Sequence, residues 1–425
     1  MPTPDPSKKT ISSSDSALEP LDDPQLEDAV GEEISASPGR LVAVPAVDTA
    51  ATPSKTDQRA DRMLLTGRAA RGLSGNVLTP TQLAWRKLKK NKLAVISLVV
   101  LIVMYTTALF AQFLAPYSYD SQDMTASFRP PVAVHWMPWP TVYPQKISFD
   151  QYHDIIYTDD PTRPQRIQLF AHGTPYRFWG VIPTDIHLFG LSGNERVYLL
   201  GTDQFGRDYL SRLLFASQIS LSVGLIGISI TLALGLLVGG ISGFYGGIVD
   251  DAIMRACEVI MSVPDFYLLL ALAAMLPPTM SPVVVYILII AILSVIGFAG
   301  MARIIRGMVL SVREREYVEA ARALGVSDLK IIIRHIIPST YTFAIVSATL
   351  SIPGYILAEA GLSFLGLGIR DPMASWGNML SAAEDLNSLE QRLWLLIPGL
   401  LIFITTLTFN FLGDGLRDAL DPKSR

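Results

Sequence analysis

The chain has 425 residues, of which 50% are hydrophobic and only 17% are charged. Soluble domains usually carry about a quarter charged residues, so this composition excludes an ordinary soluble protein and indicates a membrane protein with polar attachments. The single cysteine, Cys257, excludes an intrachain disulfide and any metal site built from several cysteines. The net charge of -4 is unevenly distributed, because residues 1–60 hold 11 Asp and Glu against 5 Lys and Arg.

The N-terminal segment, residues 1–80, is rich in Ser, Pro, Asp, Glu and Ala, and no aromatic residue precedes Trp85. Such a segment cannot bury enough apolar surface to offset chain entropy, so we expect a disordered cytoplasmic tail. It does not resemble a secretory signal peptide, because the first long apolar run begins only at Leu93. Residues 81–114 then hold a basic flank and the first membrane-spanning helix.

Six stretches are long and apolar enough to cross a bilayer, which requires roughly 20 apolar residues in a helix. They are 93–114, 213–240, 259–276, 283–302, 341–365 and 393–412. Pro353 and Gly354 are expected to bend the fifth span. The prediction is an all-α integral membrane protein with six transmembrane helices, five of them in a core formed by residues 208–425.

Basic residues predict the orientation of these spans. Five positive charges lie between Arg86 and Lys92, just before the first span, and seven more lie between the fourth and fifth spans, from Arg303 to Arg334. With six spans, both segments fall on one side, and the positive-inside rule makes that side cytoplasmic. Both termini and the loop 303–338 are then cytoplasmic, whereas the loop 115–207 is external.

The external loop 115–207 is too long for a simple connector and is rich in Trp, Tyr, Phe and Pro. We expect a small, irregular cap, with aromatic residues that rest either within the cap or at the membrane interface. Four of the five histidines lie here, His135, His153, His172 and His187, and the fifth is His335. Their spacing matches no metal-binding motif, so no metal site is predicted.

A ladder of glycines, each four residues after the last, ends the second span: Gly235, Gly239, Gly243 and Gly247. Residues four apart share one helix face, which allows a second helix to approach closely. Helix packing is the favoured interpretation, and a groove that faces a substrate is the alternative.

The segment 316–338 reads as a helix, a break and a second helix. Residues 317–324 are mostly good helix formers, and Gly325 can adopt the left-handed conformation that ends a helix. Ser327 is a suitable N-cap for the second helix, and Pro338 marks the boundary with the fifth span. An amphipathic surface hairpin would also fit. A DNA-binding helix-turn-helix is excluded, because the second helix is apolar and leads directly into a membrane span.

This segment resembles the EAA loop of permeases in ATP-binding-cassette importers. In that pattern Glu-Ala-Ala is followed by Gly and later by a terminal Pro, and Glu319, Ala320, Ala321, Gly325 and Pro338 match it. His335 stands where the general pattern has isoleucine, and histidine at that position resembles the peptide-transporting branch of the family. The resemblance implies that this loop, with Ser327 at its second helix, couples the chain to an ATPase.

Four further segments are similar to the C-type permease of oligopeptide, dipeptide and nickel importers. They are 201–208, 359–368, 371–377 and 410–422, and the resemblance as a whole covers residues 83–132 and 196–422. It implies a type I importer permease fold and leaves the tail and most of 133–195 unexplained.

Three charged residues lie at the ends of predicted spans and allow two interpretations. Glu359 is a functional candidate, as ionisable residues in spans are by default, or a glutamate bonded to a neighbouring loop. Asp414 and Arg417, three residues apart, are expected to form an ion pair worth a few tenths of a kcal/mol, or to serve a function at the membrane surface.

The family resemblance implies function and partners. It implies alternating-access transport of peptides across the bacterial inner membrane, with nickel or a modified, antibiotic-like peptide as alternative cargo. The implied partners are a B-type permease, two ATPase subunits that bind ATP and Mg, an external substrate-binding protein and membrane lipid, with no nucleic acid. The chain itself contains no Gly-Lys dipeptide, so it lacks a phosphate-binding P-loop. Two other classes are an intramembrane enzyme and a passive channel or scaffold. The spans carry no histidine and no carboxylates paired at a useful spacing, as an enzyme would need, and a channel would not require an EAA-type loop.

Overall fold

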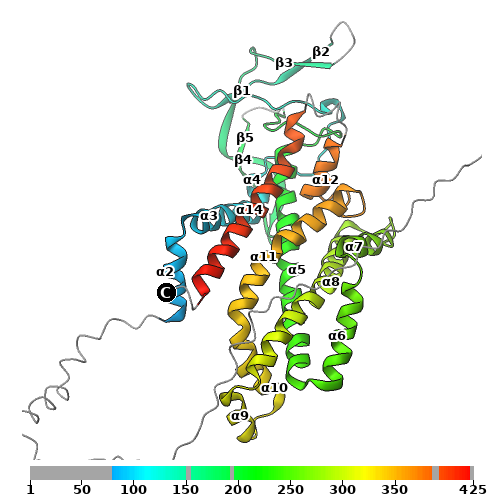
Figure 1. The fold of residues 1–425 in the computed structure, drawn as a ribbon. Helices are drawn as coiled ribbons and strands as arrows, with labels where there is room; N and C mark the ends of the chain where they lie inside the picture. Colours follow the sequence, from blue (N-terminus) through cyan, green and yellow to red (C-terminus); the bar gives the residue numbers. More distant parts are fainter. Residues whose placement is uncertain (1–78, 150–154, 192–195, 385–391, 422–425) are drawn as a thin grey trace, which may run out of the picture. The chain divides into compact units, whose positions relative to one another are not determined.

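The computed structural model describes residues 79–149, 155–191, 196–384 and 392–421. The chain divides into two units, 1–77 and 78–425, and every described residue belongs to the second. The tail expected at 1–80 therefore lies almost wholly outside the described residues. The described part is mostly helical, with one group of strands between α4 and α5 (Figure 1).

The helices begin where capping residues supply the hydrogen bonds that a helix end lacks. Thr79 and Gln82 form a capping box before α2, Asn91 accepts from the Ala94 amide before α3, and Asp208 accepts from the Ser211 amide before α5. The first helices are α2 (Pro80–Lys90), α3 (Lys92–Leu109), α4 (Ala111–Leu114), the 3-10 turn η1 (Met124–Ala126), α5 (Tyr209–Tyr245), α6 (Gly247–Met261), α7 (Asp265–Ala274) and α8 (Pro282–Val312).

The second half of the chain is also helical. It comprises α9 (Glu316–Ala323), α10 (Asp328–Ile331), a π-helical turn η2 (Ile332–Ile336), α11 (Ile337–Phe364), α12 (Trp376–Leu380), η3 (Ser381–Ala383), η4 (Leu393–Leu396) and α14 (Ile397–Leu420). Pro353 lies within α11 without ending it.

Five described helices are long and apolar enough to cross a membrane, and α6 with α7 makes a sixth if that bent pair is one span. The expected third span, 259–276, is therefore wrong as a continuous helix. The pair bends by 77° between Met261 and Asp265. Pro264 explains the break, because proline lacks an amide hydrogen and disfavours helical backbone in the residue before it.

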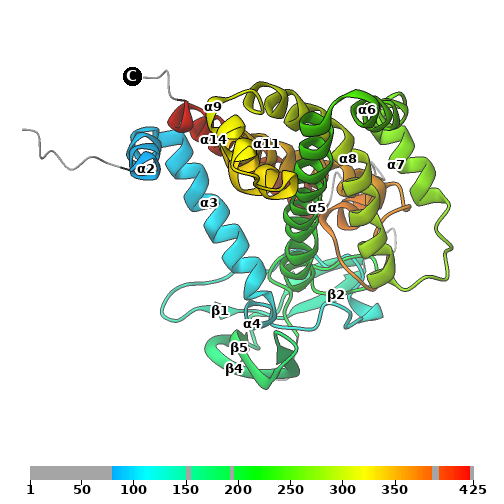
Figure 2. The ribbon, with the colours of Figure 1, turned by 90° about the horizontal axis from the view of Figure 1, so that it is seen from below.

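The long helices pack side by side around one large apolar core. α5 packs most extensively against α8, α11 packs against both α5 and α14, and α14 packs against α3 (Figures 1 and 2). Both α5 and α8 are longer than their apolar sequences predicted. As a result residues 303–312, expected in the cytoplasmic loop, continue α8 as far as Val312.

The loop between α4 and α5 contains two antiparallel sheets, so the expectation of an irregular insertion is wrong. One is the hairpin of β2 (Gln145–Phe149) and β3 (Ile155–Asp159). The other has the order β1-β4-β5, from β1 (Thr141–Val142), β4 (Gln165–Phe178) and β5 (Ile182–Leu191). The strands lie at the opposite end of the helices from α9 and α10 (Figure 1).

Candidate functional site

The helix-break-helix predicted for 316–338 is confirmed. α9 ends at Ala323, and Gly325 adopts a φ of 74°, the left-handed conformation that only glycine takes without strain. The amide of Val326 then donates to the carbonyl of Ala321 at 3.1 Å, which closes the end of α9. α10 starts at Asp328, so the chain turns sharply within four residues.

We call α9, the turn at Gly325 and α10 the elbow. One face of the elbow packs against the long helices. Val318, Ala321, Ile331, Ile332 and Ile336 are buried against Phe244 of α5 and Ile305 and Val309 of α8. The guanidinium of Arg322 lies 5.3 Å from the centre of the Phe244 ring, a cation–π contact. The elbow is therefore packed directly on α5 and α8, and it continues through Ile336 into α11.

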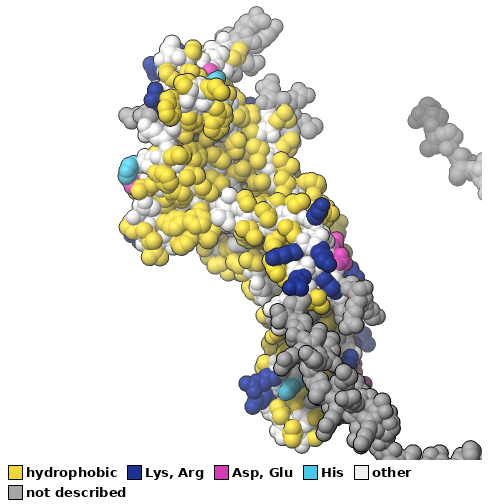
Figure 3. Space-filling model, turned by 90° about the vertical axis from the view of Figure 1, so that its left-hand side faces the viewer, with side chains coloured by type: hydrophobic (Ala, Val, Ile, Leu, Met, Phe, Trp, Pro, Cys, Tyr) yellow, Lys and Arg dark blue, Asp and Glu magenta, His cyan; other side chains and the backbone are white. Residues whose placement is uncertain are grey.

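The opposite face of the elbow is exposed. Glu319, Ala320, Gly325, Ser327 and Pro338 lie on it, whereas Ala321 belongs to the buried face. Large apolar side chains are exposed beside them, namely Tyr317, Leu324, Leu329 and Ile333, with Leu324 at 84%. Exposed apolar groups that gather among charges mark an interaction surface. Lys and Arg side chains lie beside hydrophobic ones at the lower end of the described surface (Figure 3).

Two details of the loop differ from the sequence prediction. Ser327 occupies the N-cap position of α10, but its side chain makes no capping hydrogen bond. Pro338 lies in the first turn of α11, where its missing amide hydrogen costs little, so it marks the start of the fifth span as predicted, but no break separates that span from the second helix. The helical path from 328 to 364 is continuous through the π-helical turn η2.

Three of the four ladder glycines bring α5 against α8. A Cβ at Gly235 would lie 2.4 Å from the Met301 side chain, and one at Gly239 would lie 2.4 Å from the Ala302 carbonyl oxygen. A Cβ at Gly243 would lie 2.8 Å from Val309. The prediction is wrong for Gly247. α5 ends at Tyr245, and Gly247 begins α6 with open space around it, so Gly247 does not share the packing face.

Glu359 is completely buried in α11 and is bonded to its neighbours. Ser220 of α5 donates to one carboxylate oxygen at 3.2 Å, and Ser363 donates to the other at 2.6 Å. Ser220 in turn accepts from the backbone amide of Trp376 at the start of α12. Glu359 thus joins α5, α11 and the loop helix α12, the arrangement expected of a structural glutamate.

The ion pair expected between Asp414 and Arg417 is wrong. Both side chains are exposed on α14, and no ion pair joins them in the part of the chain that the structure describes. An exposed pair of this kind gains little free energy, so solvation of the separate charges prevails.

The sequence did not predict an ion cluster at the entry to α5, in which Asp203, Arg207 and Arg212 are buried and Asp371 is half exposed. Arg207 contacts Asp203 at 2.6 Å and Asp371 at 2.7 Å, and Arg212 contacts Asp371 at 3.0 Å. Burial acts to raise the pKa of Asp371, but the hydrogen bond from Arg207 and the charge of Arg212 outweigh it and hold that pKa below the ordinary value. The cluster fastens the loop after α11 to the start of α5.

Asp208, beside this cluster, has a different environment. Burial raises the pKa of its carboxyl to about 6, against the hydrogen bonds from Ser211 that lower it. One of its oxygens accepts the Ser211 amide at 2.8 Å, and the other has no protein partner. Asp208 is therefore the N-cap of α5 and contributes a partly compensated buried charge.

Two cavities are candidate ligand sites. The larger, about 630 Å³, lies among α5, α7, α8 and α11 and is mostly apolar, with Thr231, Ser347, Ser351, Tyr355 and Asp265 at its wall. It adjoins the break in the α6–α7 span, and interrupted spans commonly line the pathway in transporters.

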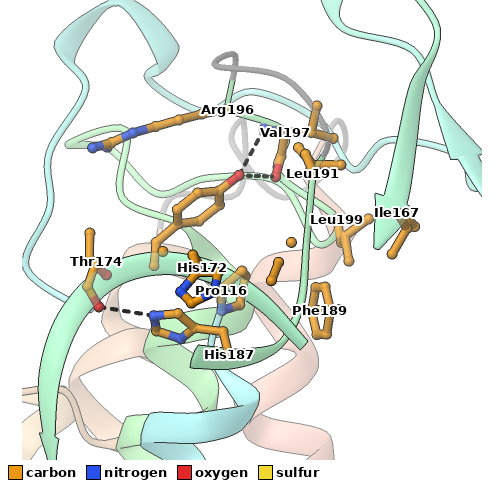
Figure 4. A pocket seen from close by; sticks show the side chains of 14 residues that line it. Pro116, Ile167, His172, Thr174, His187, Phe189, Leu191, Arg196, Val197 and Leu199 are labelled. Atoms are coloured by element: carbon orange, nitrogen blue, oxygen red, sulfur yellow. Dashed lines mark hydrogen bonds between the residues drawn. The ribbon is translucent and has the colours of Figure 1, made fainter. Parts of the chain in front are cut away.

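The smaller cavity, about 230 Å³, lies between strands β4 and β5, the segment that follows α4, and the segment that precedes α5 (Figure 4). His187 bonds the Thr174 carbonyl at 3.0 Å and His172 bonds Asp185 at 2.9 Å, so each histidine is occupied by a neighbour on its own hairpin. Among the described residues no group of three or more metal-ligating side chains occurs.

Comparisons with known proteins identify the family of the chain. The family model "Binding-protein-dependent transport system inner membrane component" matches residues 235–425, and "N-terminal TM domain of oligopeptide transport permease C" matches residues 79–131. The chain is 34% identical over 350 residues to the dipeptide transport system permease protein DppC of Bacillus subtilis (strain 168), covering 82% of this chain and 87% of that protein. The chain belongs to the family of oligopeptide and dipeptide permeases of binding-protein-dependent transport systems.

Other relatives of the permease agree. It is 43% identical to the oligopeptide transport system permease protein OppC of Haemophilus influenzae, over 54% of this chain and 72% of that protein. It is 31% identical to OppC of Bacillus subtilis (strain 168), over 80% of this chain and 89% of that protein. A solved amino acid ABC transporter with histidines overlaps 48% of the chain with a TM-score of 0.36 and 19% identity. The family model and the sequence relatives make the protein a multi-pass inner membrane transport permease and not an enzyme.

Proposed function

We propose that the permease is one half of the membrane channel of an ATP-driven peptide importer. Relatives across most of its length are named dipeptide and oligopeptide permeases, which supports a peptide cargo over nickel. A second permease of the B type would complete the pathway, and an external binding protein would deliver the peptide. ATP and Mg would be bound by two separate ATPase subunits, because this chain has no P-loop.

The observation that carries the proposal is the two-faced elbow of α9 and α10. Its inner face is packed on α5 and α8, whereas its outer face presents Glu319, Leu324 and Leu329 to a partner. An ATPase groove that receives this outer face would move the ends of three long helices whenever it moved. The elbow is therefore suited to convert closure of the two ATPases into a change in the packing of the spans.

Alternating access follows from such a connection. ATP would favour the packing in which the spans open outward, and release of peptide and phosphate would favour the inward-open packing. ATP and peptide would each shift this equilibrium only by binding one of the two packings more tightly than the other. The apolar 630 Å³ cavity beside the α6–α7 break would form this chain's share of the pathway. Both termini and the elbow would be cytoplasmic, and the strands would be external.

Charge reversal at Glu319 tests the proposal. Glu319→Lys should leave the permease at normal membrane abundance, because an exposed substitution rarely costs more than about 0.5 kcal/mol. It should nevertheless weaken retention of the ATPases on purification and reduce peptide-stimulated ATP hydrolysis. Glu384→Lys, the same change at an exposed site on the other side of the membrane, is the control. Wild-type retention and uptake in Glu319→Lys would refute the coupling role.

A further inference from the structure

The hairpin of β4 and β5 ends in an apolar tip that is largely exposed among the described residues. The turn is Trp179-Gly180, both with positive φ, as in the two-residue turns that suit a twisted hairpin. Trp179, Val181 and Ile182 are exposed there, Val181 at 78%. This hairpin lies between the segments matched by the two family models.

The tip is attached to the end of a membrane span. The indole nitrogen of Trp179 donates to the carbonyl of Leu109, the last residue of α3, at 3.1 Å, and its backbone amide donates to Gln112 at 3.0 Å. The rings of Phe178 and Trp179 lie 5.8 and 5.9 Å from that of Phe110, the residue that follows α3. β4 and β5 lie beside α4 in both ribbon views (Figures 1 and 2).

The length of α3 sets the depth of the tip. Its 18 residues span about 27 Å, close to the roughly 30 Å hydrocarbon core of a bilayer. Leu109 therefore lies near the boundary of the core, and a side chain bonded to its carbonyl lies at headgroup level. Leu93, Ile96, Val99, Ile102 and Val103 of α3 are also exposed, so the span itself presents apolar side chains along its length.

We infer that residues 178–182 lie in the lipid interface at the Leu109 end of α3, where they anchor the inserted strands to the membrane. Tryptophan favours this level because its ring is apolar and its N–H is polar, and here the N–H is already bonded to the helix end. Exposed Arg177 sits one residue before the tip, where a guanidinium can reach lipid phosphates. A lipid surface accounts for all of these features. The inference requires only that α3 spans the membrane, and it does not depend on the cargo.

Spin-label accessibility in the assembled transporter, reconstituted in phosphatidylcholine and phosphatidylglycerol nanodiscs, tests the inference. The background is Cys257→Ser, with a nitroxide on Val181→Cys or, as control, on Met137→Cys, which is 91% exposed in the segment before β1. The ratio of oxygen to nickel-complex collisions should be several-fold higher at 181 than at 137. Equal ratios would place the tip in water and overturn the inference. Protection of 181 from both reagents would place it under another protein subunit and overturn it equally.

Quenching by lipids brominated on the acyl chain provides a second measurement that leaves the hairpin's charge unchanged. Trp179→Phe should reduce the fraction of tryptophan fluorescence that these lipids quench, whereas Trp136→Phe, at an exposed site outside the hairpin, should not. An unchanged quenched fraction in Trp179→Phe would contradict the lipid contact.

Discussion

Gly239 of α5 packs directly on the backbone of Ala302 of α8, so that a Cβ at 239 would lie 2.4 Å from the Ala302 carbonyl oxygen. Gly239→Ala should push the two helices apart and lower stability by about 1–3 kcal/mol, the usual cost of overpacking. Thermal unfolding of the purified complex in detergent measures the loss. Gly307→Ala, at a glycine of α8 with open space around it, is the control and should be neutral or slightly stabilising. Equal responses of the two variants would contradict the close packing.

Glu359 can be tested by separating its hydrogen bonds from its charge. Glu359→Ala should lower stability by roughly 1–3 kcal/mol, because the buried hydroxyls of Ser220 and Ser363 lose their acceptor. Glu359→Gln keeps one acceptor oxygen and should lose less. If the residue is structural, uptake per folded complex stays near wild type in Glu359→Gln. Uptake that disappears while thermal stability is retained would instead assign the carboxylate a role in transport.

The ion cluster predicts a pH effect on stability. Because the pKa of Asp371 is lowered in the folded state, its contribution is present above the ordinary aspartate value of about 3.9 and is lost as pH falls through the lower folded value. Asp371→Asn should therefore lower the Tm at neutral pH, and its difference from wild type should shrink below about pH 4. The exposed Asp159→Asn should show no such difference. A difference that stays constant down to pH 3 would refute the ion-pair contribution.

Local sequence signals predicted the parts of the structure that local physics determines. Gly325 breaks the elbow because only glycine adopts its backbone conformation without strain, and Gly235, Gly239 and Gly243 share a face because helical periodicity requires it. The prediction for Gly247 was wrong because the four-residue spacing of glycines continues in the sequence beyond Tyr245, where the helix itself ends. The break before Asp265 was missed because the residues around Pro264 are as apolar as a span.

Relationships between distant residues could not be predicted in the same way. Asp371 is 164 residues from Arg207, its partner in the ion cluster, and nothing in either local sequence specifies the other. Glu359 was recognised as unusual because it is ionisable, but its bond to Ser220 depends on how α5 and α11 pack. The strands of the insertion were missed because their aromatic and proline-rich composition resembles irregular structure, and β4 alternates only weakly.

Substitution of Gly325 can show whether the conformation of the elbow matters for coupling, if a matched glycine controls for the backbone strain that alanine introduces. Gly325 and Gly366 have nearly equal φ, 74° and 75°, and a Cβ on either meets no atom within 4 Å. Alanine at each position should therefore impose the same local strain, about 1–2 kcal/mol. Gly325→Ala should reduce peptide-stimulated ATP hydrolysis, because it alters the elbow, whereas Gly366→Ala should not. Equal ATPase activities for the two variants at equal membrane abundance would show that the conformation of the elbow does not matter for coupling.

The orientation of the chain is tested by two exposed positions at opposite ends of the described residues. In a Cys257→Ser background, Met137→Cys lies near the strands and Leu324→Cys lies at the tip of the elbow, 91% and 84% exposed as the native residues. A membrane-impermeant maleimide added to intact cells should label position 137, and should label 324 only after the membrane is opened. The reason is the cluster of basic residues before α3 and around α9, which the positive-inside rule retains in the cytoplasm. Both native side chains are almost fully exposed, so burial within this chain cannot explain a failure to react. Labelling of 324 but not 137 in intact cells would invert the orientation and, with it, place the elbow beyond the reach of cytoplasmic ATPases.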